Sequence, residues 1–226
     1  RQSALASCLL ILKDWSNGLT LADKEIDKER GVIHQEWQLR RSPIMRIYDD
    51  VLPKFYPNSK YGHRMPIGLM SIVDNFPYQD LRDYYKKWYR PDNQCIIVVG
   101  DIDVDHTENE IKKLWANSTV PANAAQVVEE AVPDTKDAIY VFGKDKEMPY
   151  SQVGFSMKHD AFPDAQKGDM YYYVDSYAKN IITMMLNQRL SELAQKADCP
   201  FTGAYSYDGD YMLSKPKAAF NMAADA

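Results

Sequence analysis

The sequence has few cysteines and no long apolar run, and these absences exclude several classes of protein. Of the 226 residues only Cys8, Cys95 and Cys199 are cysteines, and no two form a C-x-x-C pair. We therefore expect small buried thiols rather than a disulfide framework or a thiol nucleophile. No window approaches the run of about 18 uncharged apolar residues that a membrane-spanning helix requires, so we expect no membrane span.

An excess of basic charge is also absent. Lysine and arginine number 27 against 32 aspartates and glutamates, the net charge is −5, and neither basic residue forms a long run. Proteins that bind nucleic acid carry basic patches that neutralise phosphates, so we expect no nucleic-acid partner. The apolar content of 45% is sufficient for the core of one large domain or two smaller ones.

The most informative stretch is 25–37, which reads EIDKERGVIHQEW. On a helix that advances about 100° per residue, Glu25, Glu29 and Glu36 fall inside the arc that also holds the apolar side chains of this stretch. A carboxylate on a buried face is costly unless a cation or a metal ion compensates its charge. The pattern therefore predicts either an ion-pair partner or a metal at this face.

An ion-pair explanation is available within the same helix. Arg40 follows Glu36 by four residues and Lys28 follows Glu25 by three, and both spacings allow side chains to meet on a helix. Helical geometry alone favours this structural explanation over a metal.

The remaining chain alternates helical and strand-like patterns, with a stretch at 119–136 that has no consistent period and reads as a linker. Helices are predicted over about 4–15, from a Thr20 N-cap to 41, 43–55, 77–89, from an Asp105 cap to 115, and 169–195. Strands are predicted over about 95–99, 138–142, 152–157, 201–207 and 217–223. We expect the tyrosine and methionine stripe of the last helix (Tyr172, Tyr173, Tyr177, Met184 and Met185) to lie in the core.

Several of these segments together resemble the M16 metallopeptidases, the relatives of insulinase, pitrilysin and mitochondrial processing peptidase. The segment KERGVIHQE is similar to the family signature (D/E)-K-E-R-x-V-I-x-x-E. Four further stretches resemble family motifs in the family's order: 61–68 (YGHRMPIG), 81–93 (LRDYYKKWYRPDN), 96–103 (IIVVGDID) and 185–193 (MLNQRLSEL). The likeness extends over most of the chain.

The resemblance implies a zinc-dependent endopeptidase, a hydrolase that degrades peptides. In the family an H-x-x-E-H helix supplies two histidine ligands and a general base, and a more distant glutamate supplies the third protein ligand. By position, Glu36 matches that distal zinc ligand. Glu29, two helical turns earlier, matches a second glutamate that supports the site or handles protons. Three protein ligands leave a catalytic zinc ion one open position for water.

The chain departs from the family in its histidines. His34, His63, His106 and His159 form neither H-x-x-E-H nor H-E-x-x-H. The family's motif lies well before the distal glutamate, which would place it upstream of Arg1. We therefore expect an internal fragment of a longer protein, inactive alone, with Zn²⁺ present only in the intact protein.

The resemblance also implies an α+β fold of mainly antiparallel sheets with packed helices, in two similar M16-type domains, both incomplete here. On that pattern, 1–120 is the C-terminal part of the metal-bearing domain, 121–136 a linker and 137–226 the start of the companion domain. Missing strands would expose edges and apolar surface, so we expect self-association or marginal stability. In this half of the family the 185–193 helix packs, so we interpret Arg189 as structural, together with Tyr205 and Tyr207.

Three functions are compatible with the sequence. The first is a zinc endopeptidase whose peptide substrates are enclosed together with a second M16 half, fused or separate. The second is a non-catalytic M16-like scaffold or partner subunit of a peptidase complex. The third is an unrelated helical binding module whose glutamates pair with cations such as Arg40. Retention of both Glu29 and Glu36 favours the first, and the family's bacterial members suggest export to the periplasm.

Overall fold

The computed structural model describes residues 2–226, which divide into two compact units. The first unit contains the residues up to Gln38 together with Ile67–Val127, and the second contains Leu39–Pro66 and Val128–Ala226. Helices and one small antiparallel sheet make up the regular structure, which confirms the α+β class. The three-part domain division inferred above stays a prediction.

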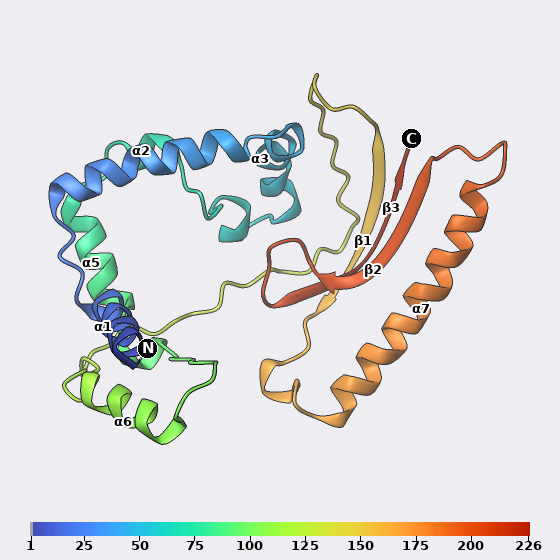
Figure 1. The fold of residues 1–226 in the computed structure, drawn as a ribbon. Coiled ribbons are helices and arrows are strands. Elements are labelled where there is room, and N and C mark those ends of the chain that lie inside the picture. The colour runs from blue at the N-terminus through green and yellow to red at the C-terminus, as the bar shows by residue number, and fades with distance from the viewer. Residues whose placement is uncertain (1) are drawn as a thin grey trace. The chain divides into compact units, whose positions relative to one another are not determined.

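Helices form the regular structure of the first unit. They are α1 (Gln2–Asn17), α2 (Asp23–Arg40, whose last two residues belong to the second unit), α4 (Met70–Val73), α5 (Tyr78–Trp88) and α6 (Val104–Leu114). Helices α1 and α6 pack side by side (Figure 1). The amide of Asn17 donates a hydrogen bond to the Ser118 hydroxyl at 3.3 Å, and the Lys13 ammonium lies 6.0 Å from the centre of the Trp115 ring.

Two predicted helix caps were wrong. Helix α6 begins at Val104 and is capped by Asp103, whose carboxylate accepts a hydrogen bond from the His106 N–H at 2.9 Å. Asp105 lies inside the first turn, where its negative charge interacts favourably with the helix dipole. Helix α2 begins at Asp23 rather than after Thr20, because Leu21 takes a left-handed backbone conformation with φ of 45° and interrupts the helix there.

The predicted strands at 95–99 and 138–142 are not formed. A strand requires a neighbour that pairs with its backbone N–H and C=O groups, and no segment of residues 2–226 pairs with either stretch. Ile97 and Val99 are 76% and 90% exposed. Instead of entering a core, residues 95–97 line an open groove of about 520 Å³ together with Trp15 and Trp88.

The second unit is built on a three-stranded sheet. Its strands are β1 (Gln152–Asp160), β2 (Gly203–Asp210) and β3 (Lys217–Asp225), in the order β1-β3-β2 with both pairs antiparallel. The long helix α7 (Met170–Ala194) runs alongside β2 (Figure 1). Helix α3 (Pro43–Phe55) is capped by Ser42, as the Ser-Pro pair predicted, and the predicted positions of these strands and of both helices are confirmed.

The core of the second unit joins α3 to the β2–β3 connection. Its buried members are Leu52, Tyr56, Val132, Tyr211 and Ala219. The Tyr56 hydroxyl donates a hydrogen bond to the Tyr211 carbonyl at 2.7 Å and accepts one from the Leu213 N–H at 2.9 Å. Burial raises the pKa of the Tyr211 phenol to about 12, so both tyrosines are neutral at physiological pH.

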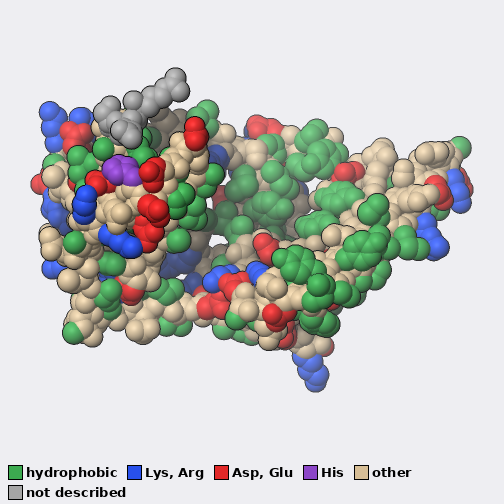
Figure 2. All heavy atoms as spheres, turned by 60° about the horizontal axis from the view of Figure 1, so that its bottom comes forward, with side chains coloured by type: hydrophobic (Ala, Val, Ile, Leu, Met, Phe, Trp, Pro, Cys, Tyr) green, Lys and Arg blue, Asp and Glu red, His purple; other side chains and the backbone are tan. Residues whose placement is uncertain are grey.

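The tyrosine and methionine stripe of α7 is not in the core, contrary to the prediction. Tyr173, Tyr177, Met184 and Met185 are each more than half exposed, because α7 packs only one side against the sheet. Figure 2 shows hydrophobic side chains gathered over the surface of the second unit. Within the described chain, no helix combines the length and apolarity needed to cross a membrane.

Candidate functional site

Helix α2 carries both glutamates singled out by the sequence. The helical period places Glu29 and Glu36 on the same side of α2, about two turns apart. Glu29 is exposed and Glu36 is half-buried. Val32, which lies between them on that side, is 51% exposed. We call this side of α2 the glutamate face.

The glutamate face is exposed at Glu29 and Val32 and half-buried at Glu36, which corrects the expectation of a fully buried arc. Glu25 is exposed and forms the predicted pair with Lys28, at 2.7 Å, in a setting where solvent screens the attraction. The only buried side chain of α2 is Ile26, at 4% exposure. The hydrogen bonds of α2 with residues 73–82 come from the opposite side.

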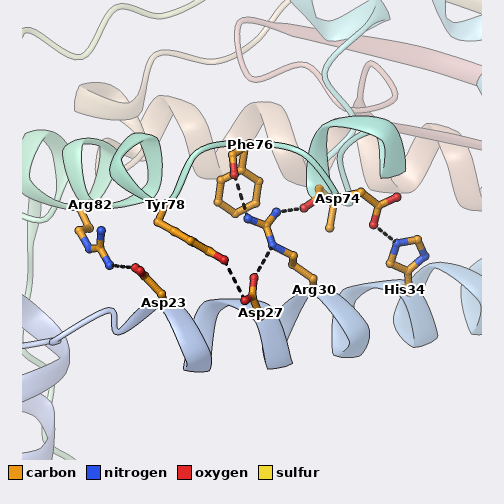
Figure 3. A network of polar contacts seen from close by, with 9 residues as sticks. Asp23, Asp27, Arg30, His34, Asp74, Phe76, Tyr78 and Arg82 are labelled. Carbon is orange, nitrogen blue, oxygen red and sulfur yellow. Dashed lines mark hydrogen bonds and ion pairs between the residues drawn. The ribbon is translucent and has the colours of Figure 1, made fainter.

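That opposite side is a polar stripe, formed by Asp23, Asp27, Arg30 and His34. These residues are spaced four, three and four apart, so they lie in one row along the helix. Figure 3 shows all four side chains pointing at residues 73–82, the segment that contains the end of α4, the following turn and the start of α5. Sequence analysis missed this row, although the spacing of its ionisable residues was readable.

Arg30 lies at the centre of the stripe (Figure 3). Its guanidinium donates hydrogen bonds to the Val73 carbonyl and, at 2.8 Å, to the Phe76 carbonyl, and its Nε lies 3.2 Å from an Asp27 carboxylate oxygen. The guanidinium carbon stands 4.0 Å from the centre of the Phe76 ring, within the range of a cation–π contact. The Arg30 side chain is only 14% exposed.

The ends of the stripe are fixed as well. The Tyr78 hydroxyl donates to the Asp27 carboxylate at 2.8 Å, and this hydrogen bond raises the pKa of the Tyr78 phenol. Arg82 pairs with Asp23. At the other end, the His34 Nε2 lies 2.6 Å from an Asp74 carboxylate oxygen. Every residue of the stripe therefore has a partner in 73–82.

The described residues do not make a zinc site by themselves. Catalytic zinc takes three protein ligands, typically with histidine nitrogens among them. Within residues 2–226, no group of three or more His, Cys, Asp or Glu side chains could hold a metal ion. His34 faces Asp74, away from the glutamate face, and His159 lies 3.1 Å from an Asp208 carboxylate. The glutamate face offers carboxylate oxygens, which suit one position of such a ligand set.

The residues interpreted as structural lie in the second unit. Arg189 is exposed, and the packing of its helix falls to Leu190, which is 6% exposed, and to Asn187, whose side chain bonds the backbone N–H and C=O of Ser206. Tyr205 and Tyr207 stack on each other, with ring centres 6.4 Å apart, and both are about half exposed. Among the described residues, these side chains belong to no cluster that could bind a metal ion.

Comparison with known proteins links this architecture to peptidases. The model of the family described as "Peptidase M16 inactive domain" matches residues 75–212. Among curated relatives, the probable zinc protease PqqL of Escherichia coli K12 is 32% identical over 197 residues, 86% of this chain and 20% of the relative. PqqL of Haemophilus influenzae is 39% identical over 116 residues, 51% of this chain and 12% of the relative. The chain thus spans a fifth or less of the length of these two relatives.

Solved structures show the same fold. The first half of the periplasmic protease PqqL from E. coli superposes with a TM-score of 0.78 at 24% identity, covering 100% of this chain and 47% of that one. A mutant of the ferredoxin protease FusC, solved in complex with Arabidopsis ferredoxin, superposes with a TM-score of 0.77 at 25% identity, covering 98% of this chain and 24% of FusC.

Proposed function

Because the chain belongs to the peptidase M16 family, we propose that it is part of a zinc-dependent endopeptidase to which it contributes Glu36 as a metal ligand. The relatives that carry this region are named zinc proteases, which supports a peptidase role for the full-length protein. Family membership excludes the unrelated helical binding module considered above.

One observation carries the proposal: α2 presents Glu29 and Glu36 on the same side, about two turns apart and turned away from its contacts with 73–82. A surface helix normally keeps its apolar residues off the exposed side, whereas α2 leaves Val32 51% exposed beside the glutamates and places the 14% exposed Arg30 against 73–82. This arrangement has a physical reason if the glutamate face borders a metal site completed by residues outside this chain.

Glu36 and Glu29 would have different roles there. The Glu36 carboxylate would occupy one protein-ligand position, with histidine nitrogens from outside the chain in the others. Zinc bound in this way would supply a Lewis acid that activates water at neutral pH. Glu29 lies about 10 Å from Glu36 along the helix axis, a separation that suits hydrogen bonding to the ligands or to water and the holding of a proton.

Peptides are the substrates that this chemistry implies, and a second M16 half, fused or separate, would enclose them. The matched half of E. coli PqqL comes from a two-part protease, which supports a second half in this protein. The E. coli protease is described as periplasmic, and we propose the same compartment here.

A second candidate is a non-catalytic scaffold or partner subunit of a peptidase complex. The description of the matched family model as an inactive domain favours it, because that match covers residues 75–212. The two candidates differ in one measurable quantity, the zinc content of the full-length protein. A stoichiometric metal ion supports the peptidase, and a metal-free, inactive full-length protein supports the scaffold.

Substitution of the two glutamates in the full-length protein tests the assignment. Glu36→Gln should abolish zinc retention and peptidase activity, since an amide is a much poorer zinc ligand than a carboxylate. Glu29→Gln should lower turnover by about 10–100-fold while leaving more of the metal bound, as expected of a residue that supports a ligand. Metal analysis and peptide hydrolysis measure both effects.

Glu25→Gln provides the matched control, because Glu25 is an exposed glutamate on the same helix and pairs only with an exposed lysine in the contacts described. It should leave zinc content and turnover near the wild-type values. Equal zinc content and turnover in wild type and Glu36→Gln would remove Glu36 from the site.

A further inference from the structure

Apolar packing holds α2 along one narrow row only. Ile26 is the only fully buried side chain on this helix, and Ile33 and Trp37 in the same row are half-buried, so these contacts alone resist rotation of α2 about its axis weakly. The polar stripe adds polar contacts that oppose this rotation, because it attaches three successive turns of α2 to 73–82 through Asp27, Arg30 and His34.

Arg30 is the one member of the stripe that binds backbone on the opposing segment. Its two terminal nitrogens donate to the carbonyls of Val73 and Phe76, which lie on either side of the turn between α4 and α5. A planar guanidinium that satisfies two fixed carbonyls and stacks on an aromatic ring has few alternative orientations. The other stripe contacts join side chains to side chains and adapt more easily.

The direction imposed by Arg30 determines where the glutamates point. On a helix of about 100° per residue, the stripe residues lie on average about 140° around the axis from Glu29 and Glu36. Holding the stripe against 73–82 therefore turns both carboxylates away from that segment. At a side-chain radius of about 6 Å, a rotation of about 20° would move each carboxylate by about 2 Å.

We propose that Arg30 is a positioning residue, which fixes the rotation of α2 through the Val73 and Phe76 carbonyls and thereby aims Glu36 and Glu29 at the metal site. The inference rests on the proposed function for its consequence at the metal, whereas the fixing of α2 stands on the contacts alone. A displacement of about 1 Å is enough to impair a catalytic or metal-ligating group, so loss of the Arg30 contacts weakens metal binding without removing any ligand.

Arg90 supplies a matched control within the same unit. Its side chain is 5% exposed, it donates to the Asp92 carboxylate at 2.9 and 3.0 Å, and it donates to the Lys87 carbonyl at 3.1 Å. Like Arg30 it is a largely buried arginine with one carboxylate partner and a backbone carbonyl, but it does not contact α2. Arg30→Gln and Arg90→Gln should therefore lower the melting temperature of the full-length protein to similar extents.

The two variants should differ at the metal. Arg30→Gln should weaken zinc affinity about 10–100-fold in chelator competition, and it should shift the visible absorption bands of the cobalt-substituted protein, which report ligand geometry. Arg90→Gln should leave both unchanged. A purely structural role for Arg30 would change zinc affinity equally in both variants, and that result, or unchanged affinity in both, would overturn the proposal.

Hydrogen exchange separates this inference from the assignment of Glu36. If Glu36→Gln retains zinc, the ligand assignment fails, but the amides of α2 still report whether Arg30 fixes the helix. Faster exchange in α2 for Arg30→Gln than for Arg90→Gln would support the fixing of α2. Equal exchange rates in the two variants would overturn it.

Discussion

Tyr56 combines hydrogen bonds and an aromatic contact in the core of the second unit. It is 0% exposed, its hydroxyl both donates to the Tyr211 carbonyl and accepts from the Leu213 N–H, and its ring meets Tyr211 edge-on at 5.4 Å. Tyr56→Phe removes two hydrogen bonds, one to the Tyr211 carbonyl and one from the Leu213 N–H, and we expect it to lower the free energy of unfolding by about 1–3 kcal/mol.

Denaturant unfolding followed by circular dichroism measures that loss. Tyr61→Phe is the control, because the Tyr61 hydroxyl accepts from the Lys215 N–H at 3.2 Å at a partly exposed position where water replaces the lost partner. We expect the Tyr61 variant to lose clearly less than the Tyr56 variant. Equal losses would show that the two hydrogen bonds of the buried Tyr56 hydroxyl contribute no more than the single exposed one of Tyr61.

The sequence identified the carboxylates of Glu29 and Glu36 as candidate site residues, but it did not identify Arg30 as the residue that orients their helix. Glu29 and Glu36 were identifiable because a family signature surrounds them, and their role stays a prediction. Arg30 sits in the same signature, yet its partners at Val73 and Phe76 are backbone carbonyls more than forty residues away, and no local pattern marks a carbonyl as an acceptor. The contacts of the polar stripe could be recognised only from the folded structure.

An ion pair joins helix α3 to the loop before β1, and it makes the stability of the folded protein depend on pH. Arg46 donates to the Asp145 carboxylate at 2.6 and 2.8 Å and to Glu147 at 2.6 Å. The Arg46 guanidinium lowers the pKa of Asp145 to about 2, below the value of about 3.9 that we expect in the unfolded chain.

A carboxyl group whose pKa is lower in the folded state stabilises the fold above the unfolded pKa. That contribution is lost as the pH falls from about 4 towards the folded value of about 2. We therefore expect the melting temperature of the wild type to fall further over that interval than that of Asp145→Asn, with the two curves converging at the acid end. Parallel curves in a thermal scan would exclude the Arg46–Asp145 pair as a source of acid sensitivity.

The positions of α3 and β1 were predictable because their signals are local, although the local cap signals at Thr20 and Asp105 were wrong. Ser42 and Pro43 mark the start of α3, and the alternation at 152–157 lies within β1. The stretch at 95–99 has the same apolar, β-branched composition as a buried strand but remains unpaired, because strand formation depends on a partner that composition does not specify. Helices satisfy their backbone within the segment, and strands do not.

The whole molecule carries an apolar surface that predicts self-association. Tyr177 is 68% exposed, Ile181 is 37% exposed and Met184 is 66% exposed, and their spacing of four and three residues places them in one row on the outer side of α7. Contiguous apolar surface of this kind marks interaction sites. We expect the isolated chain to associate at micromolar concentration, and Tyr177→Glu to weaken association about tenfold or more, as judged by sedimentation velocity.

Gln188→Glu is the control for that experiment, since it adds the same charge at an exposed polar position of the same helix. It should leave the association unchanged. A monomeric wild-type chain with a sharp unfolding transition at high temperature would contradict the prediction.

The polar stripe also bears on the order of events during synthesis. Asp23 and Arg82 are separated by 59 residues, and His34 and Asp74 by 40. At about 5–20 residues per second, α2 leaves the ribosome several seconds before its partners are made. An apolar stripe would be exposed to aggregation or to chaperones in that interval, whereas Asp23, Asp27, Arg30 and His34 are well solvated by water. The side of α2 that packs against 73–82 only after that segment is synthesised is therefore a side that is stable in contact with water.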